Sequence, residues 1–321
     1  MPTRRSSGGF SRRIPRDIAD LGFPYEFAHS RSGCIAARFA QAYGCGVYRW
    51  RENGESRFSV PFGGGNRRRA LAELAVHCRE RGMSFVLMDV PEAFAREFPC
   101  LLPGDYVVEE DRDEFDYLYR RDDLATLAGR RYQDRRRMIR RFEDAGPWTY
   151  EQLTDANVAD CRPVLEGWLR HKFADPAAAC DHLEDDNAAL EAVLGNYGAL
   201  GMVGGLLRQN GAPVAFAMGE PLNARTMLVA FERALPSVRG ASAMINREFV
   251  RRHCNGFEFV NRTCDGGDAR RGHRHGRRAQ QRGHLRLQPE RVLVRLPMSF
   301  SARSVMSSAC SVPAANASTS P

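Results

Sequence analysis

The sequence predicts a mixed α/β fold built from two successive units, and three observations carry that prediction. Between Arg57 and Phe98, short runs of strand character alternate with segments whose apolar residues have helical spacing. The dipeptide Gly146-Pro147 then interrupts the chain, and the alternation starts again at Trp148. Asn210-Gly211 separates two apolar runs, which is the strongest short signal for a β-hairpin. We therefore expect mixed, mostly antiparallel sheets that are flanked by helices.

Local patterns place the elements of the first unit. Strands are expected at 57–62 and 84–90, and helices at 66–81 and 91–98. Apolar residues in 66–81 recur three and four apart, which is typical of a helix, whereas 84–90 is an apolar run typical of a buried strand. The segment 105–119 has strand character at both of its ends. Two short helices are expected after it, with apolar stripes at 124–128 and 138–142.

The second unit is expected to begin with a strand at 149–153 and a helix that Thr154 or Asp155 caps. After a helix at 186–196, strands are expected at 205–208, 213–218, 226–231 and 257–261, with a helix at 240–253 before the last strand. Three antiparallel strands, a helix that opens on a glycine and a returning strand form the arrangement of the GCN5-related N-acyltransferase core. In that core the N-terminus of the helix faces the phosphates of the acyl donor.

Four segments carry a resemblance to a known family. They are EEDRDEFDYLYRRDDLATLAGRRYQDRRRMIRRF (109–142), GGLLRQNGAPVAFAMGEPLN (204–223), FERALPSVRGASAMINREF (231–249) and FVNR (259–262). On these segments, the chain resembles the family typified by the C-terminal domain of phosphatidylglycerol lysyltransferase, and more closely its small soluble relatives. The resemblance implies two tandem acyltransferase-like halves. In the lysyltransferase branch it implies transfer of an aminoacyl group from tRNA to a lipid head group.

The chain departs from this family pattern after Arg262. Relatives continue with an acidic-glycine turn, a helix and a final strand, whereas Cys264 opens an arginine-rich segment with almost no periodicity before Val292. We interpret this tail as frame-shifted, because Lys172 is the only lysine and arginine-rich text is typical of shifted frames in GC-rich DNA. A polyanion-binding tail is the alternative. Loss of the final strand is expected to leave an open sheet edge.

The resulting division of the chain has four parts. They are a disordered N-terminus at 1–20, a first acyltransferase-like half at 21–145, a second half at 146–263 that lacks its final strand, and a disordered arginine-rich tail at 264–321. The whole chain has a net charge of +8, but the arginine excess lies at its two ends and the residues between them are slightly acidic. The basic character therefore does not belong to the predicted fold.

Acyl transfer requires a cradle for the donor, a base for the acceptor and hydrogen-bond donors for the developing oxyanion. Arg239-Gly240-Ala241-Ser242 opens the helix at 240–253, so this segment is the candidate for binding a donor phosphate; an ordinary helix start is the alternative. Glu232 directly follows a predicted strand and is the candidate base or substrate anchor. The alternative for Glu232 is a surface ion pair with Arg239.

Further polar side chains are expected near this candidate base. Arg233 is its neighbour in the chain and a candidate for donor binding. Asn246 and Glu248 lie two residues apart on one helix and so cannot share a face; we assign the catalytic role to Asn246. Asn261 and Arg262 end the fourth strand and are candidates for binding a carboxylate or phosphate of the substrate.

An arginine-rich run extends from Arg130 to Arg141. Arg136 and Arg140 are four residues apart, so we expect them on one face of a helix. There they are candidates for binding the phosphates of tRNA or of another phosphate-bearing substrate. A solvated charged face is the alternative.

Composition limits the classes of function. The nine cysteines form no Cys-x-x-Cys pair, so we expect free thiols and neither a disulfide scaffold nor a metal site. No apolar run reaches about 18 residues and no signal peptide is evident, so we expect a cytoplasmic protein without an integral membrane segment.

These observations favour a soluble acyl- or aminoacyl-transferase with an amine or hydroxyl acceptor. Its expected co-substrate is acyl-CoA or aminoacyl-tRNA, and no tightly bound cofactor is expected. The alternative is a non-catalytic protein that binds RNA or another polyanion, or an inactive diverged relative.

Overall fold

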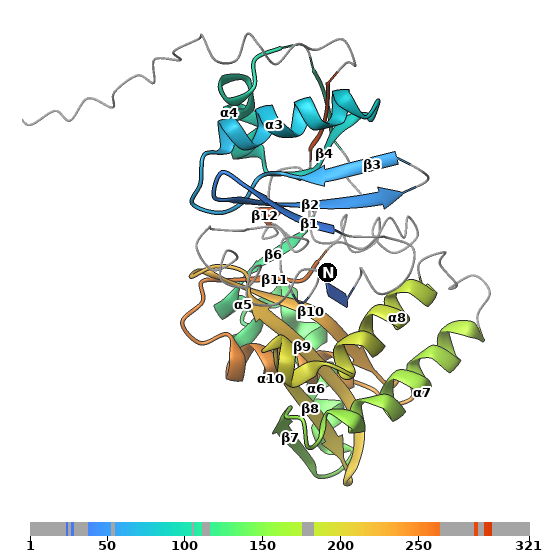
Figure 1. Ribbon diagram of the computed structural model, residues 1–321. Coiled ribbons are helices and arrows are strands. Elements are labelled where there is room, and N and C mark those ends of the chain that lie inside the picture. Colours follow the sequence, from blue (N-terminus) through green and yellow to red (C-terminus); the bar gives the residue numbers. More distant parts are fainter. Residues whose placement is uncertain are drawn as a thin grey trace, which may run out of the picture.

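The computed structural model describes residues 24, 27–28, 38–52, 55–104, 106–110, 116–174, 183–263, 286–287 and 292–296. In these ranges the chain forms two mixed β-sheets that helices flank, one above the other in Figure 1. The predicted mixed α/β class with two sheets is therefore confirmed.

The first sheet has the strand order β1-β2-β3-β4-β13-β5. Its strands are β1 (Arg38–Ala42), β2 (Cys45–Glu52), β3 (Glu55–Ser59), β4 (Phe85–Val90), β13 (Val292–Leu296) and β5 (Val107–Glu110). The parallel pair β3 and β4 is joined by α3 (Arg67–Glu80), whose first turn is capped where the Asn66 side chain accepts a hydrogen bond from the Arg69 N–H. A helix α4 (Glu92–Leu101) follows β4, and an apolar core that includes Leu71, Leu87 and Phe98 joins these elements.

The second sheet has the strand order β12-β6-β11-β10-β9-β8-β7. Its strands are β12 (Arg286–Leu287), β6 (Tyr117–Arg120), β11 (Phe259–Asn261), β10 (Thr226–Ala234), β9 (Ala212–Pro221), β8 (Val203–Gln209) and β7 (Trp148–Gln152). The pair β10 and β11 is parallel and is connected by α10 (Ala241–His253), whereas the other pairs are antiparallel. This is the predicted arrangement of three antiparallel strands, a helix and a returning strand.

Helices cover both faces of the second sheet. One core contains residues of α5 (Arg121–Thr126), α6 (Gln133–Asp144) and α10, and the other contains residues of α7 (Cys161–Phe173), α8 (Leu183–Leu194) and α9 (Tyr197–Leu200). Along β9, Ala215 and Ala217 belong to the α10 side, whereas Phe216 and Met218 belong to the α7 side. The alternation of side chains along a strand therefore separates the two cores.

Two details of the second unit can be compared directly with the sequence prediction. Asn210 and Gly211 both have positive φ, 53° and 80°, which confirms the predicted type I′ turn between β8 and β9. The predicted cap of α7 at Thr154 or Asp155 is wrong, because that helix begins at Cys161. The Thr154 N–H donates to Asn157 Oδ1 at 2.8 Å, so this segment forms a turn before the helix.

The strands β1 to β5 and β13 form the first sheet, and β6 to β12 form the second, so the change of sheet before β6 does not coincide with the predicted division at 145–146. β6 pairs with β11, and Ile139 and Phe142 of α6 pack in the same core as Met244 and Phe249 of α10. The expected open edge beside β11 is therefore wrong, because β6 occupies that edge.

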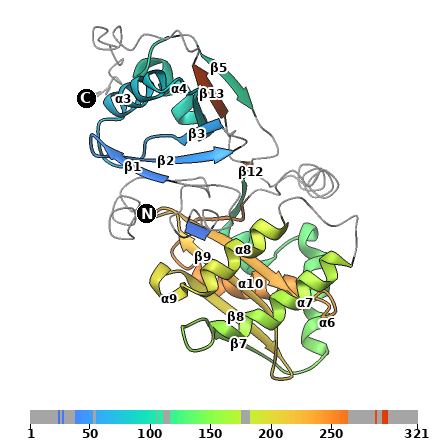
Figure 2. The same cartoon turned by 45° about the vertical axis from the view of Figure 1, so that its right-hand side comes forward.

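The arginine-rich tail contributes two strands, which corrects its prediction as a disordered segment. β12 pairs with β6, and β13 lies between β4 and β5, where it is drawn in dark red in Figure 2. Both strands that pair with β13 belong to the first unit, so the pairing of β13 does not depend on a second strand from the tail. The predicted disorder at 1–20, the segment 264–285 and the end of the chain from 297 lie outside the described residues.

Among the helices of the described ranges, none is both long enough and apolar enough to cross a membrane.

Candidate functional site

Glu232 lies near the C-terminal end of β10, on the sheet face that α10 covers. Its neighbour Phe231 belongs to the opposite core with α7, and successive side chains of a strand alternate between faces. The side chain of Glu232 is only 13% exposed. A carboxylate is therefore held at the boundary between β10 and α10 and is largely removed from solvent.

Three side chains donate hydrogen bonds to the Glu232 carboxylate. Asn246 Nδ2 lies 3.0 Å and Arg262 Nη2 lies 3.1 Å from Oε2, whereas Ser242 Oγ lies 3.3 Å from Oε1. Oε2 thus receives two good donors, and Oε1 receives one long contact from an exposed serine. The open oxygen of this carboxylate is Oε1.

The start of α10 explains how Ser242 and Asn246 reach Glu232. Gly240 has a φ of +88°, and a Cβ atom at this position would lie 2.2 Å from the carbonyl oxygen of Met138 on α6. A glycine is required here both for the backbone conformation and for the close approach of α6. Ser242 and Asn246 then follow four residues apart on one helix face, which is the face turned toward β10.

Arg262 and Arg135 surround Glu232 with positive charge. Arg262 directly follows β11, and its Nε is buried without a hydrogen-bond partner. Burial by itself would lower the pKa of Arg262, but the charge of Glu232 raises it above its ordinary value. For Arg135, burial lowers the pKa and the charge of Arg262 lowers it further, while Glu232 opposes this effect.

Arg135 is not among the site residues predicted from the sequence. The helical period places it four residues before Ile139 and seven before Phe142, and both of those side chains are buried. An arginine in the apolar stripe of a helix is a signal that could have found it. The surrounding arginines of the run concealed that signal.

The other predicted site residues lie in different surroundings. Arg233 stacks over the ring of Trp168 at 4.4 Å and donates to the backbone oxygen of Glu232 at 3.0 Å. Arg239 is exposed, and the partner of Glu232 is Arg262 and not Arg239. Gly240, Ala241 and Ser242 do form the start of α10, beside Glu232.

Three of the predicted phosphate-binding residues are not brought to Glu232. Arg136 donates to the backbone oxygens of Leu127 and Gly129, so it stabilises the turn after α5. Arg140 is exposed. Asn261 is fully buried, where its Nδ2 donates to Asp116 Oδ2 at 2.8 Å and its Oδ1 accepts from the Thr263 N–H at 2.9 Å. These contacts give Arg136 and Asn261 structural roles.

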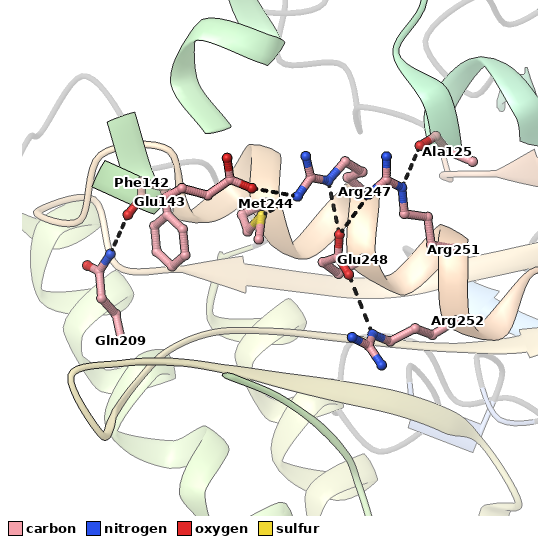
Figure 3. A network of polar contacts seen from close by, with 9 residues as sticks. All are labelled: Ala125, Phe142, Glu143, Gln209, Met244, Arg247, Glu248, Arg251 and Arg252. Carbon is pink, nitrogen blue, oxygen red and sulfur yellow. Dashed lines mark hydrogen bonds and ion pairs between the residues drawn. The ribbon is translucent and has the colours of Figure 1, made fainter. Parts of the chain in front are cut away.

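A second carboxylate on α10, Glu248, has different surroundings (Figure 3). Its side chain is 7% exposed and forms ion pairs with Arg247, Arg251 and Arg252 at 3.0, 3.4 and 3.5 Å. These arginines have further contacts with the Glu143 carboxylate, the Ala125 carbonyl and the Tyr150 ring, respectively. As predicted, Asn246 and Glu248 point to different faces of the helix.

Within the described ranges, no three His, Cys, Asp or Glu side chains come together in a group that could hold a metal ion. The cysteines described as free thiols are Cys45, Cys78, Cys100, Cys161 and Cys254. Burial raises the pKa of Cys78 to about 11 and that of Cys161 to about 12, so these two thiols stay protonated at neutral pH.

Fold and site together define a mixed α/β protein with two sheets and a carboxylate at the junction of a strand and a helix. Residues 37–283 match the family model described as "Phosphatidylglycerol lysyltransferase, C-terminal". This match covers well over half of the chain, so the chain belongs to that family. A comparison with functionally curated proteins gives no match.

Solved structures support this fold assignment. A conserved protein of unknown function from Bacteroides thetaiotaomicron is similar with a TM-score of 0.81 and 28% identity, covering 92% of this chain and 96% of that chain. The C-terminal domain of a putative lysylphosphatidylglycerol synthetase from Agrobacterium fabrum has a TM-score of 0.59 and 15% identity, covering 95% of each chain. L-PGS from Bacillus licheniformis has a TM-score of 0.58 and 13% identity, covering 92% of this chain and 96% of that chain.

Proposed function

We propose that this protein is an acyl- or aminoacyl-transferase and that Glu232 binds or deprotonates the acceptor. The donor is acyl-CoA or aminoacyl-tRNA, and the acceptor is an amine or a hydroxyl. Membership of a family described by a lysyltransferase domain supports the reaction class. The observation that carries the proposal is the Glu232 carboxylate, which has one fixed oxygen and one open oxygen beside the start of α10.

The arrangement around Glu232 suits the proton transfers of acyl transfer. An amine acceptor attacks the carbonyl carbon, a C–N bond forms, and the C–O or C–S bond to the donor breaks. Glu232 Oε1 accepts the proton that the amine loses, and the leaving oxygen or sulfur receives a proton when it departs. Asn246 and Arg262 hold Oε2, so the carboxylate keeps one orientation during these steps.

The start of α10 suits the negative charge that develops on the carbonyl oxygen. The first backbone N–H groups of a helix lack acceptors within the helix, and the helix dipole favours negative charge at this end. Ser242 belongs to this first turn and its side chain already contacts Glu232. The acceptor and the oxyanion would therefore be bound side by side. Both candidate donors are cytoplasmic molecules, so we propose that the protein acts there.

Glu232→Gln tests this proposal because it keeps the shape of the side chain and removes its charge. We expect turnover to fall by at least about 100-fold. The assays are thiol release from acyl-CoA and loss of labelled amino acid from aminoacyl-tRNA, each with a panel of amines and alcohols. Glu191→Gln is the matched control, because Glu191 also pairs with an arginine at 3.1 Å but on the exposed surface of α8. Unchanged turnover in Glu232→Gln would remove Glu232 from the mechanism.

The alternative is polyanion binding without catalysis, which the exposed arginines of α6 favour. Arg137, Arg140 and Arg141 are exposed, and Arg130 is exposed just before the helix. A binding protein of this kind should lose affinity for tRNA when Arg140 is replaced by alanine, with a steep dependence on salt. It should show no turnover with either donor.

A further inference from the structure

The surroundings of Glu232 contain more positive than negative charge. Arg262 forms an ion pair with Glu232 at 3.1 Å, and its side chain is 23% exposed. Arg135 is close enough to both groups that its ionisation responds to each of them. Two guanidinium groups thus share one carboxylate in a place where water screens them only partly.

These two arginines also have donors without acceptors. The Nε of Arg262 is buried and has no hydrogen-bond partner. Within the described ranges, no acceptor forms a hydrogen bond with the guanidinium of Arg135, although its helix neighbours have such partners. Arg136 donates to backbone oxygens and Arg137 donates to Asp134 at 3.2 Å. Arg135 and Arg262 are therefore charged groups with unused hydrogen-bonding capacity.

The backbone places these two groups at one location. Ile139 and Phe142, four and seven residues after Arg135, are buried in the core that α6 shares with α10. Val260, two residues before Arg262, lies in the same core as α6 and α10. Because residues four and seven apart on a helix and two apart in an extended chain share a face, Arg135 and Arg262 both lie on the side of α6 and β11 that faces this core.

We propose that Arg135 and Arg262 bind a phosphate group of the donor beside Glu232. This inference rests on the proposed function and names the anchor of its donor. A guanidinium presents a planar set of N–H groups that matches phosphate oxygens, and an anion here restores neutrality around Glu232. The role predicted for Arg136, Arg140 and Asn261 thus passes to Arg135, together with Arg262.

Titration of the full chain with inorganic pyrophosphate, followed by calorimetry, tests this assignment. We expect Arg135→Gln to weaken pyrophosphate binding by about tenfold or more. Arg137→Gln is the matched control, because Arg137 lies on the same helix and pairs with the exposed Asp134; its binding should be unchanged. Equal binding in wild type and Arg135→Gln, or an equal loss in Arg137→Gln, would overturn the proposal.

Two further variants separate a loss of phosphate binding from a failure to fold and from a failure of the proposed function. If Arg135→Gln does not fold, Arg135→Lys replaces it; the single ammonium lacks the planar fork, so we expect weaker binding, and unchanged affinity would overturn the proposal. Glu232→Gln keeps both guanidinium groups and should bind pyrophosphate at least as tightly as wild type. A loss of turnover in that variant with no effect of Arg135→Gln on binding would overturn this inference alone.

Competition identifies the source of the phosphate. Displacement of pyrophosphate by CoA supports a thioester donor, and displacement by deacylated tRNA supports an aminoacyl ester donor. Failure of both to displace pyrophosphate would overturn the assignment of this site to the donor.

Discussion

Glu232 on β10 and Glu248 on α10 both form ion pairs with arginines, but their surroundings differ. Glu248 receives three arginines on its two oxygens, and two of them also contact Glu143 and the Ala125 carbonyl (Figure 3). The third, Arg252, lies over the Tyr150 ring. Glu232 has one oxygen with a single long contact. The Nε of its partner Arg262 is buried without an acceptor.

This difference indicates a structural role for the Glu248 network and a functional role for the Glu232 network. A buried ion-pair network in which each carboxylate oxygen is satisfied rigidifies the structure around it. A network with an open carboxylate oxygen and unused donors has an incomplete set of partners, which a ligand can complete. Replacing the carboxylate by an amide is therefore expected to affect turnover at Glu232 and to leave the turnover of the folded protein unchanged at Glu248.

The largest stability effect is expected for Glu248→Gln. Removing one partner of a buried ion-pair network leaves the arginine charges without compensation, so we expect a loss of about 3 to 4 kcal/mol in the free energy of unfolding. Chemical denaturation measures this loss, and turnover of the folded fraction should be unchanged. A loss below about 1 kcal/mol would mean that the cluster behaves like an exposed ion pair.

A somewhat smaller effect on the free energy of unfolding is expected for Gly240→Ala, which tests how α6 packs against the start of α10 beside Glu232. The positive φ and the contact with the Met138 carbonyl oxygen should together cost about 2 to 3 kcal/mol. Gly211→Ala is the control, because its φ is +80° but no atom lies within 4 Å of the added Cβ; it should cost about 1 kcal/mol. Equal costs in thermal or chemical unfolding would show that the approach of α6 is unimportant.

The smallest effect is expected for Asn246→Ala. This substitution removes the 3.0 Å hydrogen bond that orients the Glu232 carboxylate. Turnover should fall by about tenfold, equivalent to about 1.4 kcal/mol, while Arg262 still holds Oε2. Asn196→Ala is the control, since the side chain of Asn196 donates to the Ala192 carbonyl on α8 and not to a carboxylate. If the two variants have the same turnover, Asn246 has no part in orienting Glu232.

Local sequence signals predicted much of the fold and part of the site. The Asn210-Gly211 hairpin and the start of α10 at Gly240 depend on backbone conformations that few residues adopt, so their residues identify them. Helical geometry alone predicted that Asn246 and Glu248 lie on different faces of α10.

Long-range pairing could not be predicted in the same way. The pairing of β6 with β11 joins segments about 140 residues apart, and neither strand carries a local signal of its partner. The strands β12 and β13 are short and surrounded by arginines, so composition indicated disorder where the structure has pairing. Arg135 was missed for a different reason, because the neighbouring arginines concealed its place in the apolar stripe of α6.

The most direct test of the central claim compares Glu232→Gln with Glu248→Gln in one set of measurements of turnover and of unfolding free energy. We predict different results for turnover: Glu232→Gln loses turnover by at least about 100-fold, and Glu248→Gln loses stability while the folded protein keeps its turnover. If Glu248→Gln abolished turnover and Glu232→Gln did not, Glu232 and the side chains that donate to it would not form the active site.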